Sequence, residues 1–75
     1  MPSYRVIGAD WCPFCTKVKA HLENKKADFE WIDSDTIEGT KIRNEEATKY
    51  NYSTIPMVFI NGKFVGGCSE FFAKL

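Results

Sequence analysis

The residues of this chain whose types and spacing most directly predict chemistry are the two cysteines of Trp11-Cys12-Pro13-Phe14-Cys15. Residues three positions apart at the start of a helix lie on one face, with Cβ atoms about 5–6 Å apart, so a small adjustment closes a disulfide. The free N–H groups and the positive dipole end of the helix stabilise a thiolate at the first position. We therefore expect Cys12 to be a nucleophile and Cys15, shielded by Phe14, to be the thiol that resolves the resulting mixed disulfide.

Nearby charges affect the expected chemistry of this cysteine pair, and the pair has two alternative interpretations, a zinc site and a chance pair of buried cysteines. Lys17 is expected to favour the Cys12 thiolate and Asp10 to oppose it. A zinc site would need His21 and Cys68 as the remaining ligands, but their spacing matches no zinc knuckle or ribbon. A chance pair of buried cysteines is disfavoured by the proline at the helix start. We expect no metal.

The composition excludes several classes of protein. Ten Lys and Arg balance ten Asp and Glu among 75 residues, so the chain has no net field to attract nucleic acid. The longest apolar run, 57–60, is far shorter than the ~20 residues that cross a bilayer, and the N-terminus does not resemble a secretory signal. We expect one cytoplasmic domain over 1–75, where a Cys-x-x-Cys pair favours redox chemistry over a structural disulfide.

The first half of the chain predicts a unit of two strands joined by a helix. Residues 4–8 are rich in β-formers and end at a glycine, and residues 29–33 have a similar composition. Between them, a helix is expected from Pro13, with an apolar face at Phe14, Val18 and Leu22. Two strands joined by a helix of this length form a parallel, right-handed unit.

The second half predicts a helix, a hairpin and a short final helix. The first helix is expected to be capped by Ser34 or Asp35 and to reach about Asn51, with an inward face at Ile42, Ala47 and Tyr50. Asn61-Gly62 separates the apolar runs 57–60 and 63–65 and predicts a type I′ turn. Residues 68–75 leave room for two helical turns, which completes a β-α-β-α-β-β-α order in an α/β fold.

A proline at the start of the apolar strand is a second candidate functional feature. Pro56 cannot donate to a sheet ladder, and a cis Ile55–Pro56 bond would leave the backbone of Ile55 free to pair with an extended peptide. The alternative is a trans proline that merely begins the strand, since only about 5–6% of X–Pro bonds are cis in folded proteins.

Three segments in this order resemble the signature stretches of dithiol glutaredoxins: Cys12-Pro13-Phe14-Cys15, Thr54-Ile55-Pro56-Met57-Val58-Phe59-Ile60 and Gly66-Gly67-Cys68-Ser69-Glu70. The resemblance spans nearly the whole chain. It implies a thioredoxin-like fold with a four-stranded mixed sheet flanked by helices, a cis Pro56, and glutathione as a co-substrate without a tightly bound cofactor. It also implies that Cys12 and Cys15 are the catalytic residues. The residues it implies for glutathione binding are Phe14, Arg43, Thr54, Ile55, Pro56, Gly67, Cys68 and Ser69.

By the same resemblance, each part of glutathione has an expected contact. Its cysteine pairs with the backbone of Ile55, and its glycyl carboxylate meets Arg43. Its γ-glutamyl carboxylate meets the amides of Cys68 and Ser69, which open a short helix. Gly66 and Gly67 are expected to allow close approach of the ligand to the backbone.

Two departures from the family pattern keep other functions open. Ala9 stands where glutaredoxins usually have Lys, and Trp11 after Ala9-Asp10 is similar to the segment that leads into the cysteines of thioredoxins, whose reductant is a flavoprotein. We expect a monomeric, glutathione-dependent oxidoreductase that acts on disulfide-containing or glutathionylated proteins. The alternatives are a thioredoxin-like electron donor, for example to ribonucleotide reductase, and an iron–sulfur cluster carrier. A purely structural interaction module would leave the coincidence of the three segments unexplained.

Overall fold

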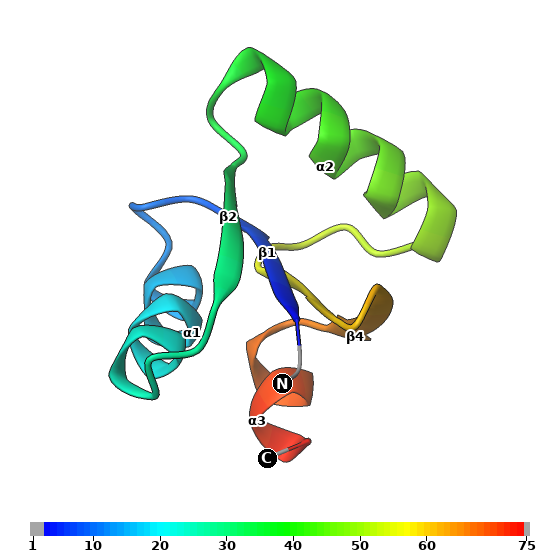
Figure 1. Ribbon diagram of the computed structural model, residues 1–75. Helices are drawn as coiled ribbons and strands as arrows, with labels where there is room; N and C mark the ends of the chain where they lie inside the picture. The colour runs from blue at the N-terminus through cyan, green and yellow to red at the C-terminus, as the bar shows by residue number, and fades with distance from the viewer. Residues whose placement is uncertain (1–2, 75) are drawn as a thin grey trace.

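The computed structural model describes residues 3–74, which form a four-stranded sheet flanked by three helices (Figure 1). The predicted order of elements is confirmed, although Leu75, the last residue of the predicted final helix, lies outside the described residues. Within residues 3–74, no helix combines the length and the apolar character needed to cross a membrane. The elements are β1 (Tyr4–Gly8), α1 (Pro13–Asn24), β2 (Phe29–Asp33), α2 (Ile37–Tyr50), β3 (Met57–Ile60), β4 (Lys63–Gly66) and α3 (Cys68–Ala73).

The sheet is mixed, with the strand order β2-β1-β3-β4. β1 and β2 are parallel and joined by α1, whereas β3 runs antiparallel to both β1 and β4. In the turn between β3 and β4, Asn61 has φ 53° and Gly62 has φ 80°. Positive φ at both central residues is the type I′ geometry that the Asn-Gly pair predicts. The fold therefore agrees with the predicted thioredoxin-like sheet.

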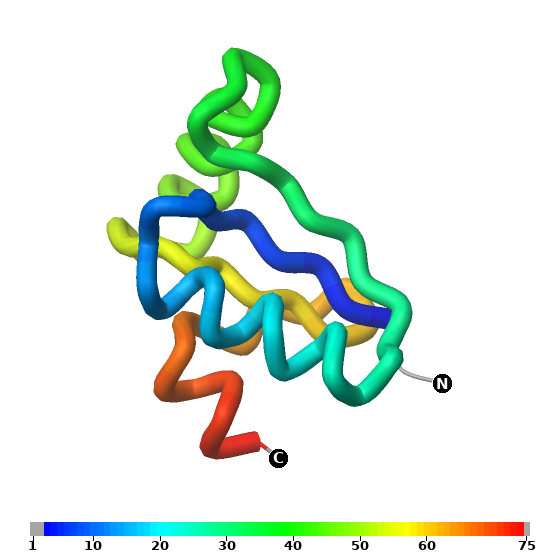
Figure 2. Tube along the Cα trace, turned by 90° about the vertical axis from the view of Figure 1, so that its left-hand side faces the viewer, coloured from blue at the N-terminus to red at the C-terminus, as the bar shows by residue number. Residues whose placement is uncertain are grey.

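The three helices cover the two faces of the sheet unequally. α1 and α3 lie on one face and α2 on the other, as the cyan and red segments on one side and the green segment on the other show in Figure 2. Because successive strand residues point to opposite faces, Val6 packs with the α1 and α3 side and its neighbour Ile7 with the α2 side. Phe71 of α3 is fully buried in the first of these two cores.

Two local predictions about the helices are wrong. The cap of α2 is Thr36, whose Oγ1 accepts a hydrogen bond from the Gly39 N–H at 2.9 Å, and not Ser34 or Asp35. Phe14 is 62% exposed, because the buried face of α1 is spaced at Cys15, Val18 and Leu22 and Phe14 lies beside it. The predicted inward face of α2 is half-buried at Ile42, Ala47 and Tyr50.

Candidate active site

The cysteine pair lies where β1 passes into α1. Cys12 is the N-cap residue of α1, with extended backbone angles (φ −89°, ψ 115°), and Pro13 occupies the first turn. Pro at this position loses no hydrogen bond, because the first N–H groups of a helix have no partner within it. Cys12 retains 7% exposure at the surface, whereas Cys15, one turn inside, is fully buried. The structure thus places Cys12 outermost, as the sequence predicts for a nucleophile.

Cys15 is buried by the end of β1 and by its neighbours, not by Phe14 as predicted. It packs with Ala9 and Cys12, and Trp31 covers the same cluster. A Cβ added at Gly8 would lie 2.8 Å from the Cys15 sulfur, so only glycine lets β1 pass this close to the thiol.

Burial raises the pKa of the Cys15 thiol to about 12. Burial is the largest cause of this rise; a hydrogen bond to Cys12 and the neighbouring sulfur charges contribute to it, while a hydrogen bond with the Ala9 backbone opposes it. Burial disfavours the charged form of any thiol, so Cys15 stays protonated at neutral pH. This protonation state fits the resolving role that the sequence predicts for Cys15.

The two charged neighbours expected to tune Cys12 contact other groups. The Lys17 ammonium lies over the Phe72 ring, 5.4 Å from its centroid. Asp10 pairs with Lys19, with Nζ and Oδ1 3.8 Å apart. Their predicted opposing effects on the Cys12 thiolate stay predictions.

The Ile55–Pro56 peptide bond is cis, as the family resemblance implies. The bond precedes β3, which begins at Met57, so Ile55 lies outside the sheet ladder. Its side chain packs against the cluster of Ala9, Cys12 and Cys15. No backbone–backbone hydrogen bond involves Ile55 in the described part of the chain, which leaves its N–H and C=O available beside Cys12.

A cavity of about 510 Å³, which we call the Arg43 cavity, opens on one side of Cys12. Within it, the Trp11 indole Nε1–H donates a hydrogen bond to Asp35 Oδ2 at 2.7 Å. The Arg43 guanidinium donates through Nη2 to Asn44 Oδ1 at 2.9 Å. The cavity therefore presents one carboxylate and one guanidinium. Its lining residues are Trp11, Cys12, Ser34, Asp35, Arg43, Ser53, Thr54 and Ile55.

A second cavity of about 310 Å³, the Cys68 cavity, lies on the other side of Thr54 and Ile55. Glu70 Oε1 accepts hydrogen bonds there from the Gly67 N–H at 2.8 Å and from the Tyr52 hydroxyl at 3.1 Å. These bonds, the Gly67 one foremost, lower the pKa of the Glu70 carboxyl. The lining residues are Phe14, Tyr52, Thr54, Ile55, Pro56, Gly67, Cys68, Ser69 and Glu70.

The two glycines before α3 make room for neighbouring side chains of the protein, and their predicted role in the approach of a ligand stays a prediction. A Cβ at Gly67 would collide with the Tyr52 hydroxyl. Gly66 has φ +131°, and a Cβ there would lie 2.8 Å from the Glu70 side chain. These glycines are therefore needed for the hydrogen bonds that hold Glu70 in place.

The structure brings the predicted binding residues together. Each of them lines one of the two cavities, and Thr54 and Ile55 line both. The two cavities flank Thr54 and Ile55, so an extended, cysteine-containing ligand that crosses these residues in a groove from one cavity to the other would have its sulfur beside Cys12. The sequence missed Asp35, Tyr52 and Glu70; only Glu70 had a local signal, since an acidic residue three positions after a cap typically bonds back to the cap N–H.

Ala9, at the position of the family lysine, has no solvent exposure. It packs against Cys12 and Cys15, and its carbonyl accepts the Cys12 N–H at 3.2 Å. A lysine there would have to bury its stem in this cluster or displace the thiols.

The residues of the alternative zinc site are engaged differently. The His21 ring packs edge-on against Phe72, with centroids 5.1 Å apart. Cys68 packs with the core on the α1 and α3 side of the sheet. Within residues 3–74, no group of three or more His, Cys, Asp or Glu side chains is positioned to hold a metal ion.

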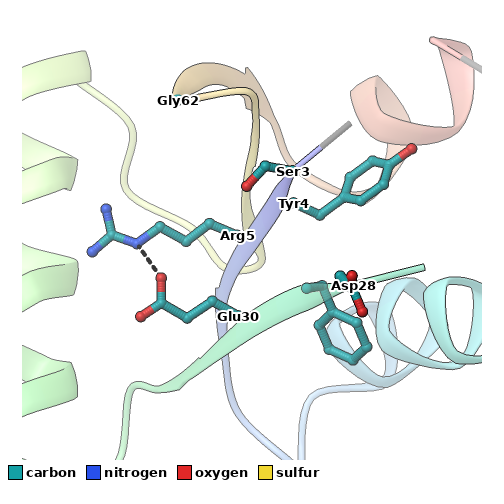
Figure 3. Close-up of a pocket in the computed structure, with 7 residues that line it drawn as sticks. Ser3, Tyr4, Arg5, Asp28, Glu30 and Gly62 are labelled. Carbon is teal, nitrogen blue, oxygen red and sulfur yellow. Dashed lines mark ion pairs between the residues drawn. The ribbon is translucent and has the colours of Figure 1, made fainter. Parts of the chain in front are cut away.

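A third cavity, of about 330 Å³, lies at the opposite end of the sheet, between the starts of β1 and β2 (Figure 3). Arg5 and Glu30 form an ion pair there, with Nε and Oε1 3.5 Å apart. Exposed pairs of this kind contribute about 0–1 kcal/mol to stability. No cysteine lines this cavity, so it is separate from the thiol chemistry.

Comparison with known proteins identifies similar chains. The glutaredoxin family model matches residues 4–65. The chain is 37% identical over 70 residues to a glutaredoxin from Ricinus communis. The matched segment covers 92% of this chain and 69% of that protein. It superposes on wheat glutaredoxin with a TM-score of 0.82 and 37% identity, covering 93% and 68% of the two chains. It superposes on a buckwheat glutaredoxin–glutathione complex with a TM-score of 0.85 and 28% identity, covering 95% and 66%. The chain therefore spans about two thirds of the length of these relatives.

Proposed function

The chain belongs to the glutaredoxin family of thiol-disulfide oxidoreductases, and from this premise we propose that it reduces protein disulfides and glutathione mixed disulfides with electrons from glutathione. One observation carries the proposal: the two cavities meet at Thr54 and Ile55, beside Cys12. A tripeptide laid along this groove would have its thiol at Cys12 and its two ends in different cavities. The similar buckwheat protein was solved as a complex with glutathione.

Each end of glutathione has a chemically suited partner in this proposal. Arg43 offers a charge-assisted hydrogen bond to the glycyl carboxylate, and the backbone of Ile55 pairs with the cysteinyl residue. The N–H groups of Cys68 and Ser69 meet the γ-glutamyl carboxylate. The Glu70 carboxylate lines the same cavity and can accept from the adjacent α-ammonium group.

The reaction with a glutathionylated protein has two thiol-exchange steps. The Cys12 thiolate attacks the glutathione sulfur, a Cys12–glutathione disulfide forms, and the protein sulfur leaves as a thiolate that takes up a proton. A second glutathione thiolate attacks the bound glutathione sulfur. Glutathione disulfide is released and the Cys12 thiolate returns.

The reaction with a protein disulfide requires Cys15. The Cys12 thiolate attacks one substrate sulfur and releases the other, which leaves the protein attached to Cys12. Cys15 loses its proton and attacks the Cys12 sulfur, so the Cys12–Cys15 disulfide closes and the substrate leaves reduced. Two glutathione molecules then reduce the Cys12–Cys15 disulfide and become glutathione disulfide.

The environment of Cys15 favours this order of events. After burial, the hydrogen bond to Cys12 and the Cys12 charge both contribute to the raised pKa of Cys15. The sulfur of Cys12 carries no charge in a mixed disulfide, so the contribution of that charge is lost there. The Cys15 pKa then falls, although burial still holds it up. Cys15 thus becomes easier to ionise only after a substrate is attached.

A reduction assay with two electron sources tests the proposal. One reaction receives glutathione with glutathione reductase, and the other receives thioredoxin reductase; a glutathionylated peptide is the substrate in both. We expect turnover only with glutathione. The rival is a donor fed by the flavoprotein, favoured by Trp11, which is 68% exposed next to Cys12. Turnover with thioredoxin reductase alone would replace the proposal by that rival.

Two serine variants test the roles of the cysteines. Cys12→Ser should abolish turnover of every substrate, because it removes the attacking sulfur. Cys15→Ser should retain removal of glutathione from a mixed disulfide, where external glutathione resolves the intermediate, and lose reduction of protein disulfides. If the two variants behave alike in both assays, the assignment of roles is wrong.

A further inference from the structure

The Arg43 cavity contains an anion as well as a cation, and this anion bears on substrate choice. We propose that Asp35 acts as a specificity residue that opposes a terminal carboxylate in this cavity, so that the site favours the free glycyl end of glutathione over a cysteine within a continuing protein chain less than Arg43 alone would make it do. The inference rests on the proposed function and concerns the substrate class that the same site accepts.

The Asp35 carboxylate is held in place from two directions. Its Oδ2 accepts the Trp11 indole N–H at 2.7 Å, and its own backbone N–H donates to Asp33 Oδ1 at 2.9 Å. Trp11 directly precedes Cys12, and both residues line the cavity together with Asp35. The negative charge is therefore held in the cavity that Cys12 also lines.

The Arg43 charge is not neutralised by Asp35. The Arg43 guanidinium donates to the neutral side chain of Asn44, and within residues 3–74 neither Arg43 nor Asp35 takes part in an ion pair. Ser34, Ser53 and the other lining side chains have no formal charge apart from the Cys12 thiolate. The cavity thus offers Arg43 to bind a ligand carboxylate and Asp35 to repel it.

The two kinds of ligand respond differently to this pair of charges. A terminal carboxylate gains the Arg43 bond and is repelled by Asp35. A polypeptide that continues past this point has an uncharged peptide group there, which avoids the repulsion and supplies an N–H donor for a carboxylate oxygen. For unit charges several Å apart at a solvent-exposed rim, Coulomb energies correspond to an effect of about three- to tenfold.

The experiment compares two disulfide substrates that differ in one charge. One cysteine-containing peptide is joined to glutathione, and the same peptide is joined to glutathione with a carboxamide in place of the glycyl carboxylate. The measured quantity is the amide-to-acid ratio of kcat/KM for the parent and for Asp35→Asn, which keeps an oxygen acceptor for the Trp11 indole. We expect the ratio to fall about three- to tenfold in Asp35→Asn, because only the acid substrate gains.

Two further variants make the test specific. Glu38→Gln removes the same charge from the first turn of α2 but lies outside both cavities, so its ratio should equal that of the parent. Arg43→Gln should raise the ratio, opposite to Asp35→Asn. A ratio in Asp35→Asn that matches Glu38→Gln, or that rises, overturns the inference and leaves the proposed function intact. If the parent turns over neither substrate, the proposed function fails and the inference fails with it.

Discussion

Replacing Gly8 by alanine should destabilise the protein through one identifiable contact. The added Cβ would lie 2.8 Å from the Cys15 sulfur and 3.0 Å from the Trp31 ring. Cys15 is fully buried in α1, so it cannot rotate away into solvent. Overpacking of this kind costs about 1–3 kcal/mol, and the stiffer unfolded chain returns about 0.4–1 kcal/mol. We expect a net loss of about 1–2 kcal/mol in the free energy of unfolding.

Urea unfolding of a double-mutant cycle with Cys15→Ala measures this contact directly. Cys15→Ala removes the sulfur but not its Cβ, which would lie 3.0 Å from the new methyl group. The Gly8→Ala penalty should therefore shrink by about 1 kcal/mol in the Cys15→Ala background, without vanishing. Gly62→Ala is the control, because its Cβ would meet no atom within 4 Å and its cost comes from φ +80°. Equal Gly8→Ala penalties in both backgrounds would refute the reasoning.

Three further outcomes follow from the site. The folded state favours the Cys15 thiol, so its contribution to stability is complete below the ordinary pKa of 9.0 and is lost as pH rises toward about 12. In that window the free energy of unfolding of the parent should fall by up to ~1.4 kcal/mol per pH unit more than that of Cys15→Ala, and equal slopes would contradict this. Cys68→Ser should retain most turnover, because the backbone amide of residue 68 is assigned to the ligand; a loss as large as that of Cys12→Ser would make Cys68 a second catalytic thiol. Arg43→Ala should raise KM for a glutathionylated peptide about three- to tenfold with little change in kcat. The effect is modest because an exposed charge-assisted bond contributes less than the ~1.5–3 kcal/mol of a shielded one. An unchanged KM would remove Arg43 from the binding site.

The order of elements could be predicted from sequence because each element has a strong local pattern. The Asn61-Gly62 turn and the strands beside it are examples. The cap of α2 could not be predicted from sequence, because Ser34, Asp35 and Thr36 are all good capping residues. The choice depends on a tertiary contact: the Ser34 N–H donates to the Gly8 carbonyl at 2.8 Å, which ties Ser34 to β1 and leaves Thr36 free to cap.

The residues of the candidate site could also be predicted from sequence only in part. The cysteine pair is visible as a local spacing, and the family resemblance supplies the residues around Pro56 and α3. Asp35 and Tyr52 were missed because their hydrogen bonds, to Trp11 and Glu70, join residues 24 and 18 positions apart. Only the folded chain brings such partners together.

The central claim is that Cys12 is the sulfur that exchanges with glutathione. The most direct test incubates Cys15→Ser with glutathione disulfide at neutral pH and follows, by proteolysis and mass spectrometry, which cysteine becomes glutathionylated. We expect glutathione on Cys12 at least about tenfold faster than on Cys68, because Cys12 caps the twelve-residue helix α1 and packs with Ile55, where the glutathione sulfur is expected, whereas Cys68 lines the cavity assigned to the γ-glutamyl end. Glutathione that accumulates first on Cys68, or equally on both residues, would contradict the account.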